Sequence, residues 1–418
     1  MGMNNAGPWR GRRFSVVIPT RNRAKTLLST LQTCVAQSFS NFEIVICDNF
    51  STPETRAVVE QLNSDKIIYH GSPTQLSMAD NWNLATTLAS GEFITIIGDD
   101  DALMPYAFEQ LDRVLKKTNV LALRWESALY AWPDIARPEL ANYLQIPLSR
   151  SYEFLNGRKT IGEVLNARTS GPTLPNIYHG MVANSLLSDI RKKTGRVFGS
   201  HHCDTYSSFA VAYHVGKYLS LSTPMSIQGF SGASNNIAFN SMRRKSTVGQ
   251  NYRVESAGAP VNSLIPDLPT HYVVLPESFL AAKADLFPND SSLVLDRKVL
   301  VNQLLNHMPI DTIDEWPAAV AEIRRAVSDD AELLAWFELR LKNTKPKTSP
   351  RDSLRPRFMG FSNGRLHLDV KKRGITNVAQ AAQLAAQIMS AGGNNLIVEK
   401  EGFGDRMLRK LKVARFVL

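Results

Sequence analysis

Three consecutive aspartates, Asp99 to Asp101, follow the apolar run EFITII at 92–97. Adjacent carboxylates repel one another and resist removal from water unless a cation neutralises them. Mg²⁺ and Mn²⁺ prefer carboxylate oxygens and often complete their coordination with water and substrate phosphates. A turn followed by a helix N-cap is the alternative, but a cap accounts for only one aspartate. We therefore predict that this segment holds Mn²⁺ or Mg²⁺ and clamps a diphosphate.

Polar groups also follow two other apolar runs. Asp48 comes after EIVIC (43–47), where its carboxylate could accept hydrogen bonds from a base or a ribose, or could close an Asx-turn. Arg21 and Arg23 follow the run FSVVI (14–18) and precede a helical stretch. Basic side chains and helix amides at such a junction could meet phosphate, although a solvated face is the alternative.

The elements that must position these groups form a regular alternation. Short β-rich runs alternate with helical stretches of about three turns, a pattern typical of βαβ units and of a parallel sheet covered on both faces. The expected strands are 14–18, 43–47, 66–70, 92–97 and 120–124, and the expected helices are 24–37, 53–63, 77–90 and 105–117. Ligands bind beyond the carboxyl ends of such strands. We predict an α/β doubly wound sheet in which these polar segments converge on one pocket.

The remainder of the chain divides into weaker patterns. Between 131 and 199 prolines interrupt the periodicity, and a helical signal near Thr205 then precedes a strand at 218–222. A helical extension follows at 276–342, flanked by irregular linkers at 236–272 and 343–356. The predicted organisation is a nucleotide-binding domain at 1–235, a linker and helical extension at 236–345, and a small C-terminal region at 346–418.

The C-terminal tail is basic and amphipathic. Phe403, Met407 and Leu411 recur at helical spacing beside Arg406, Arg409, Lys410 and Lys412. Such a segment could rest on an anionic bilayer, or it could pack against its own domain.

Bulk properties limit the class of protein. The formal charge of +10 favours an anionic partner, such as a nucleotide diphosphate, a lipid surface or nucleic acid. Three widely spaced cysteines form neither a disulfide framework nor a zinc-finger pattern, and we expect reduced packing residues. Neither a membrane span nor a secretory signal is recognisable, so we expect a cytoplasmic location, with the tail as a peripheral contact on the inner face of a membrane.

Two segments together resemble a known family. FSVVIPTRNRAKTLLSTLQTCVAQSFSNFEIVICDNFS and, further on, ASGEFITIIGDDDALMP are similar to the family-2 inverting glycosyltransferases with the GT-A fold. The similarity is strong over about residues 13–125 and extends weakly to about 235. It implies a Rossmann-like, mixed nucleotide-binding sheet, a nucleotide-sugar donor and a divalent metal.

The resemblance also assigns roles to individual residues. Thr20 with Pro19, and Asp48, would contact the base and ribose of a nucleotide, which we expect to be uridine-linked. Residues 98–101 match the metal-and-diphosphate motif, but Gly98 replaces its usual first aspartate, so Asp99 or Asp101 is the expected principal metal ligand. The predicted nucleotide-sugar contacts are Pro19, Thr20, Arg21, Arg23, Asp48, Asn81, Asp99 and Asp100. Asp80 stands where many relatives carry arginine, which reverses the charge beside Asn81.

The resemblance finally implies a catalytic base. Asp204, in FGSHHCDTYSSFAVAY, stands where relatives place the aspartate that takes the proton from the acceptor hydroxyl; an ordinary N-cap is the alternative. His179 could line the acceptor pocket or satisfy a loop. The predicted activity is transfer of a sugar, with inversion, to a hydroxyl of a glycan or lipid-linked saccharide in surface polysaccharide synthesis. The alternatives are a sugar-phosphate nucleotidyltransferase, which would need a glycine-rich phosphate loop, and a non-catalytic basic protein that binds nucleic acid.

Overall fold

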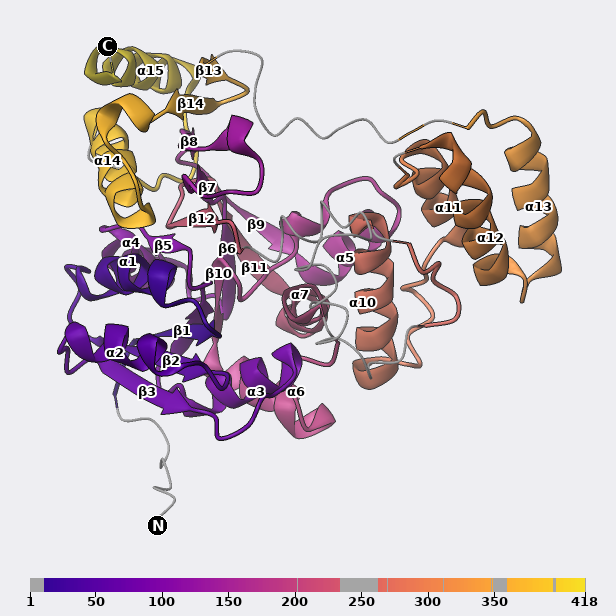
Figure 1. Cartoon of the computed structure of the whole chain (residues 1–418), viewed down its shortest axis with the longest axis horizontal. Helices are drawn as coiled ribbons and strands as arrows, with labels where there is room; N and C mark the ends of the chain where they lie inside the picture. The colour runs from indigo at the N-terminus through magenta and orange to yellow at the C-terminus, as the bar shows by residue number, and fades with distance from the viewer. Residues whose placement is uncertain are drawn as a thin grey trace.

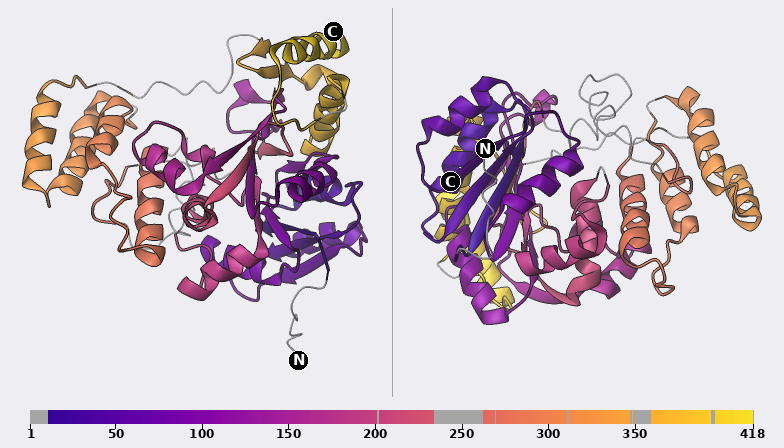
Figure 2. Two further views of the ribbon diagram at one scale, coloured as in Figure 1. Left: turned by 180° about the vertical axis from the view of Figure 1, so that it is seen from behind. Right: turned by 90° about the horizontal axis from the view of Figure 1, so that it is seen from below.

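The computed structural model describes residues 11–200, 202–233, 262–268, 270–310, 312–346, 348, 359–393 and 396–417. Over these residues the chain forms two β-sheets flanked by helices, together with a group of helices that projects to one side (Figure 1). The two further views in Figure 2 place the indigo N-terminal strands and the yellow C-terminal helices together, opposite the projecting orange helices.

The first sheet follows the predicted alternation. Within the described residues it has eight strands in the order β3-β2-β1-β4-β10-β6-β11-β9. The strands are β1 Phe14–Thr20, β2 Phe42–Asp48, β3 Ile67–Gly71, β4 Phe93–Ile96, β6 Ala122–Trp125, β9 Tyr152–Asn156, β10 Gly180–Ala183 and β11 Lys217–Leu221. The first four are parallel, whereas β10 and β9 run antiparallel to their neighbours, so the predicted mixed α/β sheet is confirmed.

Register and burial explain why the polar groups meet. The strands β1 and β2 are mostly apolar and almost entirely buried, as expected for parallel strands covered on both faces. The pairing of β1 with β2 sets Thr20 directly beside Asp48 at the carboxyl ends. The aspartates at 99–101 follow β4, the neighbour of β1 on its other side.

Helices cover both faces of this sheet. They are α1 Ala24–Val35, α2 Pro53–Gln61, α3 Met78–Leu88, α4 Ala107–Thr118, α5 Gly157–Leu165, α6 Asn184–Thr194 and α7 Cys203–Val215. In α4 the buried residues Phe108, Leu111 and Leu115 recur at helical spacing, and the helix ends at Asn119 in the left-handed conformation. Figure 1 shows α1 on one side of the strands and α7 on the other.

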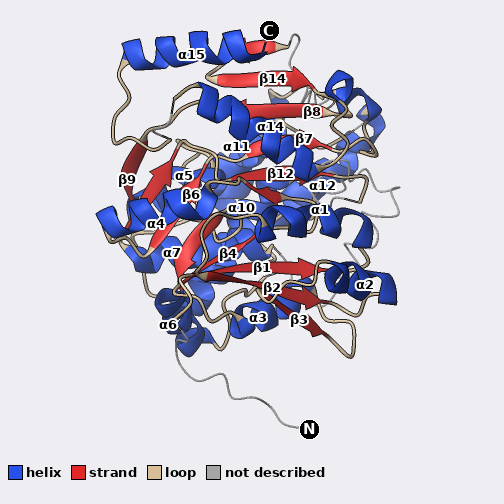
Figure 3. Ribbon diagram, turned by 90° about the vertical axis from the view of Figure 1, so that its left-hand side faces the viewer, coloured by secondary structure: helices blue, strands red, loops and turns tan. Residues whose placement is uncertain are grey.

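A second sheet begins at the aspartates themselves. Within the described chain it has six strands in the order β13-β14-β8-β7-β12-β5. The strands are β5 Ala102–Leu103, β7 Ala128–Ala131, β8 Tyr143–Pro147, β12 Ser226–Phe230, β13 Gly360–Ser362 and β14 Arg365–Asp369. Figure 3 shows β12, β7, β8 and β14 stacked above β1 and β2. Because β5 pairs with β12, this sheet holds the segment that follows Asp101.

The C-terminal region is built into this second sheet. β14 pairs with β8 along five residues, from Arg365 opposite Pro147 to Asp369 opposite Tyr143. Helix α14 (Val378–Ala391) packs against α1 and shares the main core, and α15 (Phe403–Val417) lies on α14. Part of the predicted small C-terminal region, 346–418, is thus shared with the second sheet and the main core. The partner strand of β14 lies more than 200 residues earlier, which a local pattern cannot reveal.

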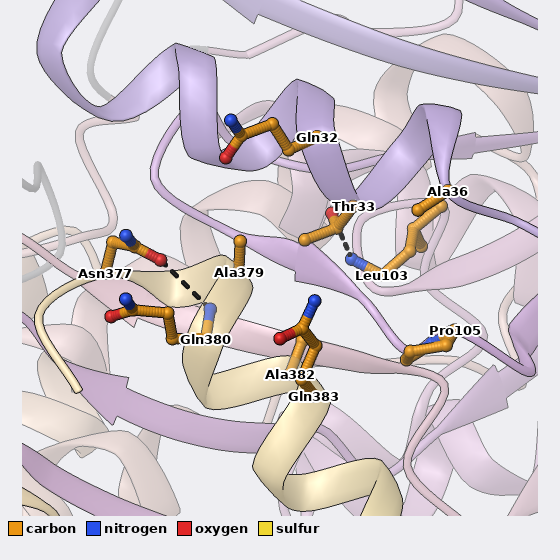
Figure 4. Close-up of a pocket in the computed structure, with 10 residues that line it drawn as sticks. All are labelled: Gln32, Thr33, Ala36, Leu103, Pro105, Asn377, Ala379, Gln380, Ala382 and Gln383. Carbon is orange, nitrogen blue, oxygen red and sulfur yellow. Dashed lines mark hydrogen bonds between the residues drawn. The ribbon is translucent and has the colours of Figure 1, made fainter. Parts of the chain in front are cut away.

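A cavity of about 350 Å³ lies between α1 and α14. Figure 4 shows Gln32 and Thr33 of α1 facing Gln380 and Gln383 of α14 across it. Its walls contain residues that follow the aspartates, such as Leu103 and Pro105, and none of the aspartates themselves.

The predicted helical extension is confirmed. It comprises α10 His271–Leu286, α11 Arg297–Asn306, α12 Trp316–Val327 and α13 Ala331–Lys342. α10 packs on α7, with the rings of Phe279 and Phe209 at 5.5 Å, while the later helices form a second core around Leu304, Ile323 and Phe337. The predicted linkers at 236–272 and 343–356 lie largely outside the described residues.

Two further expectations can be compared with the structure. Cys34, Cys47 and Cys203 are all buried and none is in a disulfide, in agreement with the prediction of reduced packing residues. Among the described helices, none combines the length and the apolar character that crossing a bilayer requires.

Candidate active site

Asp101 closes the turn that follows β4. Its Oδ2 accepts hydrogen bonds from the Gly98 N–H (2.6 Å) and the Tyr178 hydroxyl (2.8 Å), and its Oδ1 accepts one from the Gly229 N–H (2.7 Å). The His179 Nε2 lies 3.1 Å from Oδ2. Burial favours the neutral carboxyl, but the charge of His179 and these donors together lower the pKa of Asp101. Asp101 therefore joins β4, β10 and β12 around the turn.

Gly98 is explained by the same crowding. A Cβ at position 98 would lie 2.9 Å from the Asp101 Oδ2 and 3.1 Å from the Tyr178 hydroxyl. Because real Cβ atoms are almost never found so close, a side chain here would force Asp101 or Tyr178 to move. An aspartate at position 98, where the motif usually has its first one, would therefore not fit beside the hydrogen bonds that Asp101 makes in this chain.

Asp101 fits a structural role better than the metal-ligand role predicted for it. Both of its oxygens already accept hydrogen bonds, and the residue has no exposed surface. A metal ion would have to displace these donors, each of which would then be left unsatisfied in a buried place.

Asp99 and Asp100 accept fewer hydrogen bonds than Asp101, and the bonds from Thr20 and from Ser231 each reach only one carboxylate oxygen. The Asp99 Oδ2 accepts a hydrogen bond from the Thr20 hydroxyl at 2.6 Å, and its Oδ1 lies 4.0 Å from Arg23 Nη1. The Asp100 Oδ2 accepts hydrogen bonds from the hydroxyl (2.7 Å) and N–H (3.3 Å) of Ser231. Burial raises the pKa of both carboxyls, and repulsion from neighbouring aspartates adds to it, so that the pKa of Asp100 rises to about 7.

These two carboxylates fit a divalent cation that shares its coordination with phosphate. The described chain contains no group of three or more His, Cys, Asp or Glu side chains that could hold a metal. Mg²⁺ sites in phosphate-handling proteins need only one or two carboxylates, because substrate phosphates complete the shell. A cation beside Asp99 and Asp100 would also relieve the repulsion that raises their pKa values.

The end of β2 forms the neighbouring wall. The Asp48 Oδ1 accepts the Ser51 N–H at 3.0 Å, three residues on rather than the two of an Asx-turn, and its Oδ2 accepts the Tyr69 hydroxyl at 2.6 Å. The Asn49 N–H donates to the Thr20 carbonyl at 2.9 Å and ties the two strand ends together. Phe50 follows with a φ of 59° and a side chain that is 59% exposed. Such a conformation is unusual for a bulky residue and marks a functional candidate.

Of the residues predicted to contact the nucleotide sugar, the arginines and Asn81 lie in two different places. Arg23 is the N-cap residue of α1 and approaches Asp99, and the half-buried Arg21 lies on the same loop after Pro19. Asn81 lies behind β2 instead: its Oδ1 accepts from the Cys47 Sγ at 3.2 Å, and only 4% of the residue is exposed. This position suits anchoring of α3 rather than contact with a sugar.

The charge reversal at Asp80 has a local explanation. The Ser77 hydroxyl accepts the Asp80 N–H at 3.1 Å and donates to the Asp80 Oδ2 at 2.7 Å. Ser77 is the N-cap of α3, and an acidic residue in the first turn of a helix is stabilised by the helix dipole.

Asp204 lies at the same site as the aspartate turn. It is the second residue of α7, whose N-cap is His202, so the alternative that Asp204 is the N-cap is wrong. Burial raises the pKa of Asp204, although hydrogen bonds from Thr205 and Asn176 oppose the shift. Burial also raises the pKa of Tyr178, with the charges of Asp101, Asp100 and Asp204 adding to it. Tyr178, whose hydroxyl donates to Asp101, is therefore within electrostatic range of Asp204 as well.

Several residues of the site escape the sequence analysis. Tyr178, Ser231 and Trp132 contact the aspartates, with the Trp132 Nε1 donating to the Asp100 carbonyl at 3.0 Å. His179, predicted to line the acceptor pocket or to satisfy a loop, contacts Asp101 and has its Nδ1 2.7 Å from the Ser226 hydroxyl. A φ of 54° at His179 reflects this tight placement.

Comparison with known proteins assigns the first part of the chain. A model of the family described as glycosyl transferase family 2 matches residues 15–170. The GalNAc(5)-diNAcBac-PP-undecaprenol beta-1,3-glucosyltransferase of Campylobacter jejuni is 33% identical over 110 residues, which are 26% of this chain and 35% of that protein. The UDP-Glc:alpha-D-GlcNAc-diphosphoundecaprenol beta-1,3-glucosyltransferase WfaP of Escherichia coli is 29% identical over 87 residues, which are 21% and 35% of the two chains.

The matched segments span about a third of the length of these relatives. Among solved structures, S. aureus TarS 1-349 in complex with UDP-GlcNAc has a TM-score of 0.44 and 16% identity, with 84% of this chain and 100% of that chain covered. The family match extends from β1 through α5 and includes Thr20, Asp48 and the aspartate turn. Through residues 15–170, the chain belongs to glycosyl transferase family 2.

Proposed function

We propose that this protein is an inverting glycosyltransferase that moves a sugar from a nucleotide-sugar donor to a hydroxyl of a glycan or lipid-linked saccharide. The observation that carries the proposal is the buried pair Asp99 and Asp100 at the carboxyl end of β4, with Thr20 and Arg23 beside it. Asp204 lies within electrostatic range of Tyr178, which donates a hydrogen bond to the same turn. This arrangement offers one place for a diphosphate and an adjacent carboxylate for the acceptor.

The strand ends would bind the donor. Thr20 and Asp48 lie side by side where a nucleoside can bind them. The Arg23 guanidinium, 4.0 Å from the Asp99 carboxylate, is near enough to contact a phosphate held there, and Arg21 lies two residues earlier in the chain. A UDP-linked donor is supported by the name of the Escherichia coli relative. A lipid-linked acceptor in surface polysaccharide synthesis is supported by the names of both relatives.

Asp99 and Asp100 would hold Mn²⁺ or Mg²⁺. When bound, the ion would supply positive charge to the leaving diphosphate. The protein's own part is to keep both carboxylates at the desolvated turn that Asp101 holds in place. Arg23 adds a fixed positive charge on the same side, and preorganised charge of this kind is usually the largest contribution to catalysis.

Asp204 would act as the general base. In an inverting transfer the acceptor oxygen attacks the anomeric carbon from the face opposite the diphosphate, and a carboxylate oxygen of Asp204 would take the hydroxyl proton. Its raised pKa makes the carboxylate a better proton acceptor at neutral pH.

The test is a donor and acceptor screen. Release of nucleoside diphosphate is followed from a panel of nucleotide sugars, with Mn²⁺, Mg²⁺ or chelator and with short lipid-linked saccharides. We expect Asp100→Asn to lower the rate by roughly 10²-fold or more and Asp204→Asn to lower it by roughly 10²–10⁴-fold. Asp189→Asn, which changes an exposed carboxylate of α6, is the matched control and should leave the rate unchanged. If the folded protein neither binds nor turns over any nucleotide sugar, the proposal is wrong.

A further inference from the structure

Helix α15 exposes an apolar stripe. Phe403 is 82% exposed, Met407 57% and Leu411 56%, and residues four apart lie on one face of a helix. Leu408, at 53%, widens the stripe. Of the fourteen large apolar side chains exposed in the described chain, five lie on this one helix. A concentration of this kind marks a binding surface, whereas single exposed apolar residues are ordinary.

The exposure is a feature of a firmly placed helix. The opposite face of α15 buries Val413 and Arg409, and Arg409 forms an ion pair with Glu401. Nearby, Arg150 donates hydrogen bonds to the carbonyls of Gly393 and Met389 at the end of α14, on which α15 lies. The stripe is therefore presented outward by a helix whose other face is fixed.

Positive charge surrounds the stripe. Lys410, Lys412 and Arg415 lie on α15, and Asp405 is the acidic residue of its first turn. The exposed segment Lys371–Arg373 adds three more cations, and it adjoins α15 because Arg373 donates a hydrogen bond to the Val417 carbonyl at 2.7 Å. Figures 1 and 3 both place α15 at one end of the molecule, beyond β14.

We propose that α15 is an interfacial anchor that binds an anionic bilayer surface. An apolar face with phenylalanine and leucine, bordered by lysine and arginine, is the composition of helices that lie in the headgroup region. Anionic headgroups complement the bordering charge. A second copy of the chain fits less well, because a symmetric contact would bring two like-charged surfaces together.

The anchor would hold the protein where lipid-linked acceptors occur. Membrane binding by α15 does not depend on the proposed activity. Its test therefore measures binding and needs no substrate. Full-length protein is mixed with vesicles of phosphatidylcholine, with or without phosphatidylglycerol, and bound protein is quantified by flotation at low and high salt.

Two variants separate the apolar and the charged contributions. The triple change Phe403→Ser, Met407→Ser and Leu411→Ser removes the stripe, and we expect vesicle binding to weaken roughly tenfold or more. The pair Lys412→Gln and Arg415→Gln should weaken binding to anionic vesicles about fivefold per residue and leave weak binding to neutral vesicles unchanged. Val294→Ser with Leu339→Ser removes exposed apolar side chains from the helical extension instead, and should bind like the wild type.

Circular dichroism of each variant serves as the control for folding. Salt-sensitive binding to anionic vesicles that only the α15 variants lose supports the anchor. Equal binding by wild type and stripe variant, or no vesicle binding by the wild type, overturns it. A dimer in light scattering that the stripe variant abolishes, without vesicle binding, would assign the surface to a second copy.

Discussion

The carboxylates of Asp99, Asp100 and Asp101 are adjacent in sequence but have different surroundings. Asp101 accepts hydrogen bonds on both oxygens. Asp99 accepts one from the Thr20 hydroxyl and lies near the Arg23 guanidinium, and Asp100 accepts one from the Ser231 hydroxyl. Asp101 thus stabilises the turn, whereas the burial of the Asp99 and Asp100 carboxylates costs free energy unless a cation neutralises them. Each difference gives a measurable prediction.

Asp100→Asn should change how stability depends on pH. The native pKa of Asp100 is about 7 against an ordinary 3.8, so the native state binds more protons than the unfolded state between these values. The free energy of unfolding of the metal-free wild type should therefore fall as pH rises from about 4 to 7, by up to about 4 kcal/mol from this group. The variant should lack this decrease and be more stable at pH 8.

Urea denaturation in chelator between pH 4.5 and 8.5 measures this difference. Parallel pH profiles for wild type and variant would show that Asp100 does not carry a destabilising charge. Added Mn²⁺ should raise the melting temperature of the wild type more than that of the variant, because the cation is expected beside Asp100.

Asp101→Ala should destabilise the fold, unlike Asp99→Ala. Removing the Asp101 carboxylate leaves the buried N–H groups of Gly98 and Gly229 and the Tyr178 hydroxyl without their acceptor, at a cost of about 3 kcal/mol or more. Asp99→Ala removes the hydrogen bond of the Thr20 hydroxyl and the 4.0 Å ion pair with Arg23 but relieves repulsion among the aspartates, so we expect a change of about 1 kcal/mol or less, together with loss of activity. Thermal denaturation compares the two, and equal destabilisation would contradict the structural role of Asp101.

At the level of elements, the site depends on the close approach of strand β12 to the aspartate turn. The Gly229 N–H bonds Asp101, and a Cβ on Gly229 would lie 1.8 Å from the Asp100 carbonyl oxygen. Backbone approaches backbone here, so neither side can yield without separating the two segments.

Gly229→Ala should therefore lower the free energy of unfolding by about 2 kcal/mol or more and reduce activity with it. The matched control is Gly162→Ala in α5, where a Cβ would meet nothing within 4 Å. Alanine at that helical position should stabilise by about 0.5–1 kcal/mol. Chemical denaturation of both variants tests the contrast, and a neutral Gly229→Ala would show that β12 can move away from the turn.

The elements that the sequence predicts best are those with a strong local pattern. β1, β2 and β4 are apolar runs ended by polar residues, so the convergence of Thr20, Asp48 and the aspartates follows from chain order alone. Tyr178 and His179 lie in a stretch where prolines and short strands hide any periodicity. Their approach to Asp101 depends on β10 joining the sheet antiparallel between β4 and β6, which no local signal encodes.

For the whole molecule, the C-terminal region completes the core. Leu366, Val378 and Ile388 are buried in the main core, whereas α15 buries little besides Arg409 and Val413. The chain therefore depends on β14 and α14 far more than on its last helix.

Truncation distinguishes these parts. A chain ending at Asn343 should be insoluble or unfolded, because it loses β14 and α14 and exposes their apolar partners on β8 and α1. A chain ending at Gly402 should remain folded, with a modest decrease in melting temperature, since it loses only α15. Solubility and circular dichroism provide the measurement, and a well-folded chain ending at Asn343 would show that the second sheet forms without β14.

The pairing of β8 with β14 also sets an order of events during synthesis. Pro147 leaves the ribosome long before its partner Arg365, and at about 5–20 residues per second the interval is roughly 10–40 seconds. During that time the β8 edge that will pair with β14 has no partner strand, and open strand edges invite pairing with other chains. We therefore expect the newly made chain to be prone to aggregation until its last sixty or so residues have been synthesised.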